Sequence, residues 1–197
     1  MTSSGQRVLI GWLQAGLIFS AGGLYAQNRA SAKSLSEVRL QEIVRVALGE
    51  GISIYGEMRP RFIVGDFNGD NRRDLALVVD VEASLSRITS GLPVSDLSTS
   101  DLSPLPPGTS GHHCLGLAII HDVDATTAGV SPVGRQLFYG CFSSWRLVRK
   151  SRAAVLARGA IAQPRGDALI LDLESGGVLM LYSDGVSYHA YIYTRSD

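Results

Sequence analysis

Apolar residues recur at helical spacing in one stretch near the start of the chain. Three or four residues separate neighbours on this face, which consists of Leu40, Ile43, Val44, Ala47 and Leu48. The preceding segment 34–37 reads Ser-Leu-Ser-Glu, a capping box in which Ser34 caps the helix and Glu37 reaches back. The spacing predicts one amphipathic helix over about 35–48, whose apolar face covers a sheet.

Beyond this helix, apolar and β-branched residues gather in short runs that are typical of strands. These runs lie at 62–64, 75–79, 117–120, 137–139, 168–173, 178–182 and 186–193. Gly176-Gly177 and Asp184-Gly185 separate the last three runs, and both are dipeptides of tight hairpin turns. Strands and helices do not alternate, which argues against a doubly wound parallel fold. The pattern predicts an α+β fold: an N-terminal amphipathic helix packed on a mainly antiparallel β-sheet that ends in a three-stranded meander.

The first 26 residues follow a different pattern. Arg7 is their only charged residue, and an apolar run follows it as far as Ala26. A basic start, an apolar run and a small residue at its end are typical of a secretory signal peptide. An uncleaved membrane anchor is the alternative, because residues 8–26 are 19 uncharged residues, close to the length that spans a bilayer. We expect residues 1–26 to be a signal peptide, and the protein to be secreted or periplasmic.

We expect residues 27–197 to form a single compact domain with one flexible loop. Segment 89–111 is rich in Ser, Pro and Gly, and three prolines stand within residues 104–107. Proline removes a backbone donor and breaks helices, so this segment forms no helix or central strand. The segment predicts a long surface loop within the domain.

The composition limits which class of protein this is and which kinds of partner it can bind. The 197 residues are 45% hydrophobic, which suffices for one domain with a core, and the formal net charge is zero, which argues against a nucleic-acid-binding protein. In an oxidising compartment Cys114 and Cys141 would form a disulfide, with two buried free thiols as the alternative. We expect an extracellular or periplasmic ligand, no nucleic acid, and contact with a membrane only through the signal segment if it is uncleaved.

One motif, in residues 64–75, indicates metal binding. Oxygen ligands stand at alternate positions of a short loop: the side chains of Asp66, Asn68, Asp70 and Asp74, with the backbone carbonyl of Arg72 between the last two. Calcium takes about six to eight hard oxygen ligands, and carboxylates so close together repel one another without a cation. The spacing predicts a Ca²⁺ site. The alternative is a polar turn whose carboxylates are neutralised by Arg72 and Arg73.

The same stretch resembles the calcium loop of FG-GAP/VCBS repeats, the integrin-α-like motif Gly-Asp-x-Asn-Gly-Asp-Gly-x-x-Asp-Leu. The matching residues are Gly65, Asp66, Asn68, Gly69, Asp70, Asp74 and Leu75. Asn71 replaces the usual Gly, and Asn tolerates the left-handed conformation better than most residues. The motif occurs once, so the chain is not a propeller, which needs several repeats. The resemblance implies a small secreted bacterial protein that carries a single calcium loop within a compact sheet.

Three further groups of residues indicate other functions. A cell-envelope hydrolase would use His112, His121 and Asp122. In the last predicted strand, one face carries His189, Tyr191 and Tyr193, which suits stacking on a carbohydrate or peptide but also an ordinary solvent-facing strand. Four positive charges lie within seven residues and would dock an acidic partner or form a solvated turn: Arg146, Arg149, Lys150 and Arg152.

We therefore predict a calcium-binding module in which Ca²⁺ structurally stabilises a β-loop and which serves adhesion or ligand binding. No acid, base or nucleophile stands beside the loop in a recognisable pattern, so the sequence assigns no catalytic residue. The hydrolase and the carbohydrate- or peptide-binding protein stay as alternatives.

Overall fold

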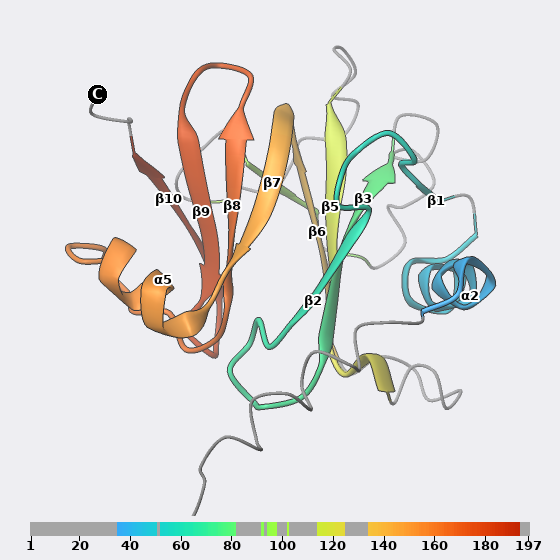
Figure 1. Cartoon of the computed structure of the whole chain (residues 1–197), viewed down its shortest axis with the longest axis horizontal. Helices are drawn as coiled ribbons and strands as arrows, with labels where there is room; N and C mark the ends of the chain where they lie inside the picture. The colour runs from blue at the N-terminus through green and yellow to red at the C-terminus, as the bar shows by residue number, and fades with distance from the viewer. Residues whose placement is uncertain are drawn as a thin grey trace, which may run out of the picture. The chain divides into compact units, whose positions relative to one another are not determined.

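The computed structural model describes residues 35–50, 52–81, 92, 94–97, 102, 114–124 and 134–193. In this part the chain is mostly β, with ten strands in two sheets and two helices, α2 and α5 (Figure 1). The predicted signal peptide lies outside the described residues, as does most of segment 89–111. No helix in the described part is long and apolar enough to cross a membrane.

The first sheet has six strands: β1 (Ser53–Ile54), β2 (Phe62–Gly65), β3 (Asp74–Asp80), β4 (Val94–Asp96), β5 (Leu115–Ile120) and β6 (Arg135–Gly140). The strand order is β1–β3–β5–β6–β4, and β2 also pairs with β3. All pairs are antiparallel except that of β4 with β6. Strands β3 and β5 are buried along nearly their whole length, which explains why their sequences are continuous apolar runs.

The second sheet has four antiparallel strands: β7 (Phe142–Val148), β8 (Ala168–Leu173), β9 (Val178–Ser183) and β10 (Tyr188–Tyr193). Their order is β10–β9–β8–β7, so consecutive strands are neighbours. The two hairpin dipeptides lie between β8 and β9 and between β9 and β10. Strand β7 was not predicted from the sequence.

The predicted α+β fold, with one helix on a single sheet, is wrong because the chain forms two sheets and is mostly β. The sheets pack face to face, and their inner faces share one buried cluster. Its members include Ala76, Leu117 and Phe138 from the first sheet and Trp145, Leu171 and Leu181 from the second. The prediction failed at β7, where apolar and polar residues mix and a register shift between Phe142 and Ser144 interrupts the alternation.

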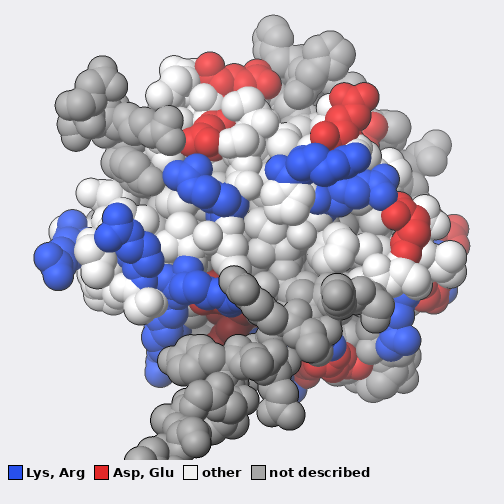
Figure 2. All heavy atoms as spheres, viewed as in Figure 1, with Lys and Arg blue, Asp and Glu red and all other residues white. Residues whose placement is uncertain are grey.

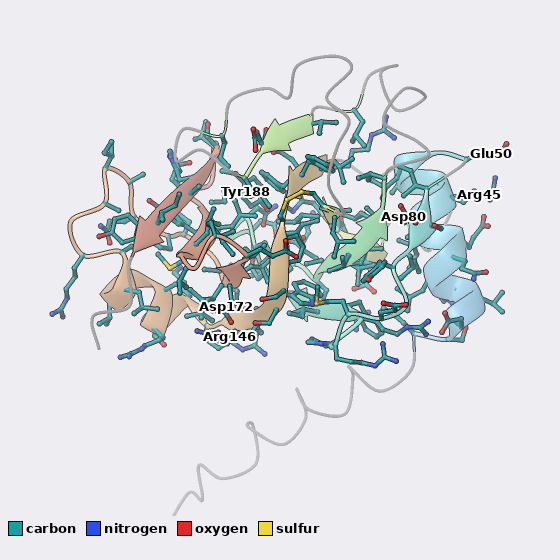
Figure 3. The ribbon with its side chains drawn as sticks, turned by 90° about the horizontal axis from the view of Figure 1, so that it is seen from above. Arg45, Glu50, Asp80, Arg146, Asp172 and Tyr188 are labelled. Atoms are coloured by element: carbon teal, nitrogen blue, oxygen red, sulfur yellow. A yellow bond between two sulfur atoms is a disulfide. The ribbon has the colours of Figure 1, made fainter. Side chains whose placement is uncertain are left out.

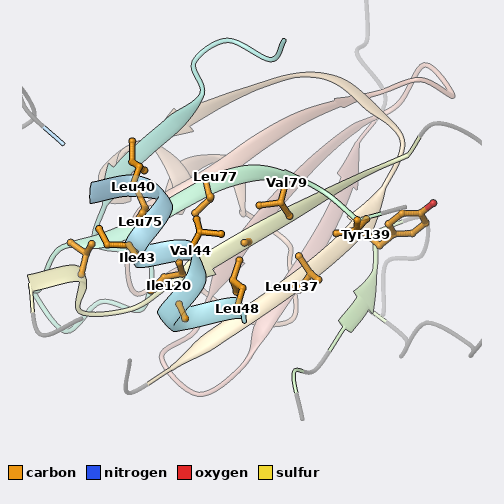
Figure 4. Close-up of a cluster of buried hydrophobic side chains, with 14 of the residues drawn as sticks. Leu40, Ile43, Val44, Leu48, Leu75, Leu77, Val79, Ile120, Leu137 and Tyr139 are labelled. Carbon is orange, nitrogen blue, oxygen red and sulfur yellow. The ribbon is translucent and has the colours of Figure 1, made fainter. Parts of the chain in front are cut away.

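Helix α2 (Glu37–Leu48) begins two residues later than the sequence predicts. Its N-cap is Ser36, whose hydroxyl accepts a hydrogen bond from the Arg39 N–H at 3.3 Å. The predicted cap, Ser34, lies outside the described residues. The predicted apolar face is buried in a cluster with residues of β3, β5 and β6 (Figure 4). Helix α5 (Lys150–Leu156) buries Ala153 and Ala157 against residues of β8 and β9.

The predicted disulfide between Cys114 and Cys141 is confirmed. Cys114 precedes β5, and Cys141 is the residue at which the chain passes from β6 in the first sheet to β7 in the second. The bond therefore ties the point where the chain changes sheet to the centre of the first sheet. Disulfides persist in oxidising environments, and this one is typical of a protein outside the cytosol.

Candidate functional site

The loop that carries the calcium motif joins β2 to β3. It is wound around its first carboxylate: the Oδ1 of Asp66 accepts hydrogen bonds from the N–H groups of Gly69 at 2.8 Å and Asp70 at 3.1 Å, and its Oδ2 accepts one from Asn71 at 3.0 Å. Asn71 has a φ of 65°, the left-handed conformation for which the resembling motif uses Gly. The loop therefore turns sharply at Asn71.

Asn68, which is half-buried, and Asp70, which is exposed, form the outer side of this loop. The Oδ1 of Asp70 accepts a hydrogen bond from the Arg72 N–H at 2.8 Å, and its Oδ2 accepts one from the Asn68 side-chain amide at 3.0 Å. The Oδ1 of Asn68 accepts one from the Asp70 N–H at 3.0 Å. These two side chains hold each other, and neither is buried.

Asp74, the last carboxylate of the motif, is fully buried. Its Oδ2 accepts a hydrogen bond from the Phe67 N–H at 2.7 Å, and its Oδ1 accepts one from the Asp122 N–H at 3.1 Å. The Nδ1 of His121 lies 3.1 Å from the Oδ2, within ion-pair distance, but its direction is not that of a hydrogen bond. Asp74 therefore joins the loop to the turn that follows β5.

The two arginines of the loop form ion pairs with that same turn. Arg72 pairs with Asp122, and Arg73 pairs with Asp124. The Arg73 guanidinium lowers the pKa of Asp124, because the hydrogen-bonded ion pair favours the charged carboxylate. The alternative explanation of the motif requires Arg72 and Arg73 to neutralise Asp66, Asp70 and Asp74. Their ion pairs run to Asp122 and Asp124 instead.

The donor chemistry of the loop fits Ca²⁺, although its side chains do not form a closed cage. Among the residues that the structure describes, no three His, Cys, Asp or Glu side chains are gathered closely enough to hold a metal ion. The carboxylates of Asp66, Asp70 and Asp74 accept N–H groups instead. The Oδ2 of Asp66, the Oδ1 of Asp74 and both carboxylate oxygens of Asp70 accept one hydrogen bond each and keep a further lone pair. Asp70 is exposed, so its side chain can reorient at low cost. All the candidate ligands, with the Arg72 carbonyl, are hard oxygens of the kind that calcium prefers.

The loop is also held by the chain that leads into the second sheet. The Asp167 N–H donates to the Asp66 carbonyl at 2.6 Å, and a Cβ on Gly166 would lie only 2.2 Å from that carbonyl oxygen. The Asp167 carboxylate accepts hydrogen bonds from the Arg149 guanidinium at 2.7 Å and the Lys150 N–H at 3.0 Å, at the start of α5. The loop of the first sheet therefore contacts the segment that leads into β8 of the second sheet.

A pocket of about 320 Å³ opens beside the loop. Four segments line it: the loop, residues 121–122, residues 134–136 and the β9–β10 hairpin. It brings His121 and Asp122, the predicted hydrolase residues, next to Asn68 and Asp70 of the calcium motif. His112 lies outside the described residues.

Tyr188 lines this pocket and was missed from the sequence (Figure 3). Its hydroxyl lies 3.3 Å from the Nε2 of His121, and the two rings are stacked with centroids 6.0 Å apart. Burial raises the pKa of Tyr188, and the negative charges of Asp74 and Asp66 raise it further. Tyr188 stands on the opposite face of β10 from the predicted Tyr191, and the alternation of the strand is the signal that could have identified it.

The predicted ligand face of β10 points to the other side of the sheet. The His189 ring lies 5.5 Å from that of Tyr182, and its Nε2 lies 2.8 Å from the Oδ2 of Asp184. Tyr191 is partly buried against the α5 cluster, and nothing is described of the Tyr193 side chain. Tyr191 therefore packs with residues of α5, and neither His189 nor Tyr191 lines the pocket.

No known protein family, no curated protein and no solved structure matches this chain.

Proposed function

We propose that the chain is a secreted or periplasmic calcium-binding module in which Ca²⁺ stabilises the loop 66–74. The observation that carries this proposal is the charge of the loop. Asp66, Asp70 and Asp74 stand within nine residues, while the ion pairs of Arg72 and Arg73 run to Asp122 and Asp124. A divalent cation among the three carboxylates offsets their mutual repulsion.

The contacts of the loop support a structural role for this cation. Asp66 holds the loop backbone through three N–H groups, and its carbonyl accepts the N–H of Asp167, the residue that precedes β8. A cation that orders the loop therefore also stabilises the contact between the sheets. The resemblance to FG-GAP/VCBS loops supports the same ligands, and the disulfide supports a location outside the cytosol.

Calorimetric titration of the full chain with Ca²⁺ tests the proposal. We expect a dissociation constant of about 0.1–1 mM, the range of extracellular calcium modules. Asp70→Asn should weaken binding at least about tenfold, because it removes one ligand charge. The amide oxygen still accepts the Arg72 N–H, so the variant should fold normally.

Glu174→Gln is the matched control, because it removes the same charge from an exposed residue in the β8–β9 turn. Its affinity should equal that of the wild type. No binding heat with the wild type, or equal affinities for the wild type and Asp70→Asn, would contradict the proposal.

A second candidate function, a cell-envelope hydrolase, is favoured by one observation. His121 and Asp122 line the same pocket as the loop, and Tyr188 is within reach of the His121 ring. Screening the protein against chromogenic esters, phosphoesters and glycosides tests this function. Turnover that is lost in Tyr188→Phe, with calcium affinity unchanged, would support it, and the absence of turnover on every class would end it.

A further inference from the structure

The surface of α5 and of the turn after it is strongly cationic. From Arg146 to Gly166 the chain carries six Lys or Arg residues and no Asp or Glu. Arg149 is paired with Asp167, and Arg146 is paired with Asp172 at 3.4 Å (Figure 3). The other four are exposed and form no ion pair with any residue that the structure describes: Lys150, Arg152, Arg158 and Arg165. Figure 2 shows a group of Lys and Arg side chains over α5, at its lower left.

Two apolar side chains protrude among these cations. Ile161 is fully exposed, and 41% of Val155 is exposed. Arg152, Val155, Arg158 and Ile161 follow one another at intervals of three residues. The last turn runs past the end of α5, because the N–H groups of Ala157 and Arg158 bond to the carbonyls of Ala153 and Val155. This turn ends at Gly159, whose φ is 97°. The first three residues of the series therefore project from one side of the same coil. The opposite side, through Ala153 and Ala157, packs on the second sheet.

We propose that this α5 surface, defined as Lys150, Arg152, Val155, Arg158 and Ile161, docks the protein on an anionic phospholipid bilayer. The cations would lie at the lipid phosphates, while Ile161 and Val155 enter the boundary between headgroups and acyl chains. A helix of this length lies on the membrane and does not span it, so the binding is reversible and sensitive to salt.

The mixture of charge and apolar side chains selects this partner over other anionic ones. A nucleic acid or an acidic protein would use the cations and leave a fully exposed isoleucine without a role. A bilayer uses both, because its phosphates lie directly above an apolar layer. The α5 surface shares no residue with the calcium motif, so the two proposals stand or fall separately.

Co-sedimentation of the full chain with lipid vesicles tests the proposal. Vesicles of phosphatidylcholine with phosphatidylglycerol are compared with vesicles of phosphatidylcholine alone, in chelator so that Ca²⁺ does not bridge protein and lipid. The protein should sediment with the anionic vesicles, and added salt should release it. Arg152→Glu and Arg158→Glu should each weaken partitioning at least about fivefold. Ile161→Ser should weaken it at least about threefold.

Arg39→Glu and Val38→Ser, both on exposed positions of α2, are the matched controls and should leave partitioning unchanged. Equal binding of the wild type to both kinds of vesicle, or no binding to either, would overturn the proposal. Binding to a DNA duplex or to polyglutamate that Ile161→Ser does not weaken would also overturn it, because the surface would then recognise charge alone. If a charge variant does not fold, the salt dependence of the wild type and the Ile161→Ser variant still decide.

Discussion

At the scale of single residues, the loop carboxylates differ in their hydrogen-bond partners: Asp66 bonds within its own loop, and Asp74 also bonds to a distant segment. Asp66 accepts hydrogen bonds from three N–H groups of its own loop. Asp74 is buried and accepts the N–H of Asp122, 48 residues away. The sequence identified both residues as candidate ligands. It could not identify the contact of Asp122 with Asp74 or that of Tyr188 with His121, because those contacts depend on how distant strands pair.

A substitution at Gly166 tests the close approach between the loop and the segment that leads into β8. A Cβ at this position would lie 2.2 Å from the Asp66 carbonyl oxygen, and backbone must move to admit it. Gly166→Ala should therefore lower the free energy of unfolding by at least about 1–3 kcal/mol, as overpacking does elsewhere. Urea unfolding measures the change.

Gly177→Ala is its control, since a Cβ there would meet only ordinary contacts at 3.7 Å. This variant should change the free energy of unfolding by less than about 1 kcal/mol. Equal effects of the two substitutions would show that the loop does not lie against residues 165–167 in solution.

Asp184, in the β9–β10 hairpin, makes the free energy of unfolding depend on pH in the acidic range. The N–H of Ser187, the His189 ring and the N–H of Val186 hold the pKa of Asp184 well below its ordinary value of 3.8. A carboxyl with a lowered pKa in the folded state stabilises the fold above its unfolded pKa, and this contribution is lost as the pH falls through the folded pKa. The wild type should therefore lose more stability between about pH 5 and about pH 3 than Asp184→Asn does. Urea midpoints at the two pH values measure this, and parallel losses in both proteins would contradict it.

At the scale of elements, the sequence predicted the helix and the strands whose own apolar pattern marks them. Helix α2 and the strands β3, β5, β8 and β9 lie close to their predicted positions, because spacing and buried apolar runs are visible in the sequence. Strand β7 was missed because its own sequence has no strand pattern. It is a strand because it pairs with β8 and buries Trp145 in the core. Missing β7 also hid the second sheet, and this led to the wrong fold class.

The start of α2 gives a direct test at this scale. Ser36→Ala removes the hydroxyl that accepts the Arg39 N–H, and should lower the free energy of unfolding by about 1 kcal/mol. Ser53→Ala, at an exposed position in β1, is the control and should change it by less than about 0.5 kcal/mol. Chemical unfolding compares the two, and a loss at Ser53 as large as that at Ser36 would argue against the cap.

At the scale of the whole domain, several long-range contacts hold the two sheets together. The inner faces share a hydrophobic cluster, and the Trp145 indole N–H donates to the Pro60 carbonyl at 2.8 Å. The calcium motif contacts residues 165–167 at one end. The disulfide lies where the chain leaves the first sheet for the second.

The disulfide should contribute measurably to the stability of the domain. It links residues 27 positions apart, and a loop of that size corresponds to about 3.5 kcal/mol of unfolded-state entropy. Replacing both cysteines by serine should lower the free energy of unfolding by about that amount. Reductant should affect the wild type and leave the double variant unchanged. A double variant as stable as the oxidised wild type would contradict this role.

The thermal unfolding of the full chain in saturating Ca²⁺ and in chelator is the most direct test of the central claim. At a hundredfold excess over the dissociation constant, Ca²⁺ should add about 2.7 kcal/mol. For a domain of this size that corresponds to a rise in Tm of roughly 5–10 °C. Asp70→Asn, with its affinity about tenfold weaker, should show about half of this rise or less at the same Ca²⁺ concentration, and Glu174→Gln the full rise. Identical melting temperatures in Ca²⁺ and chelator, with no calcium in the purified protein, would contradict the account.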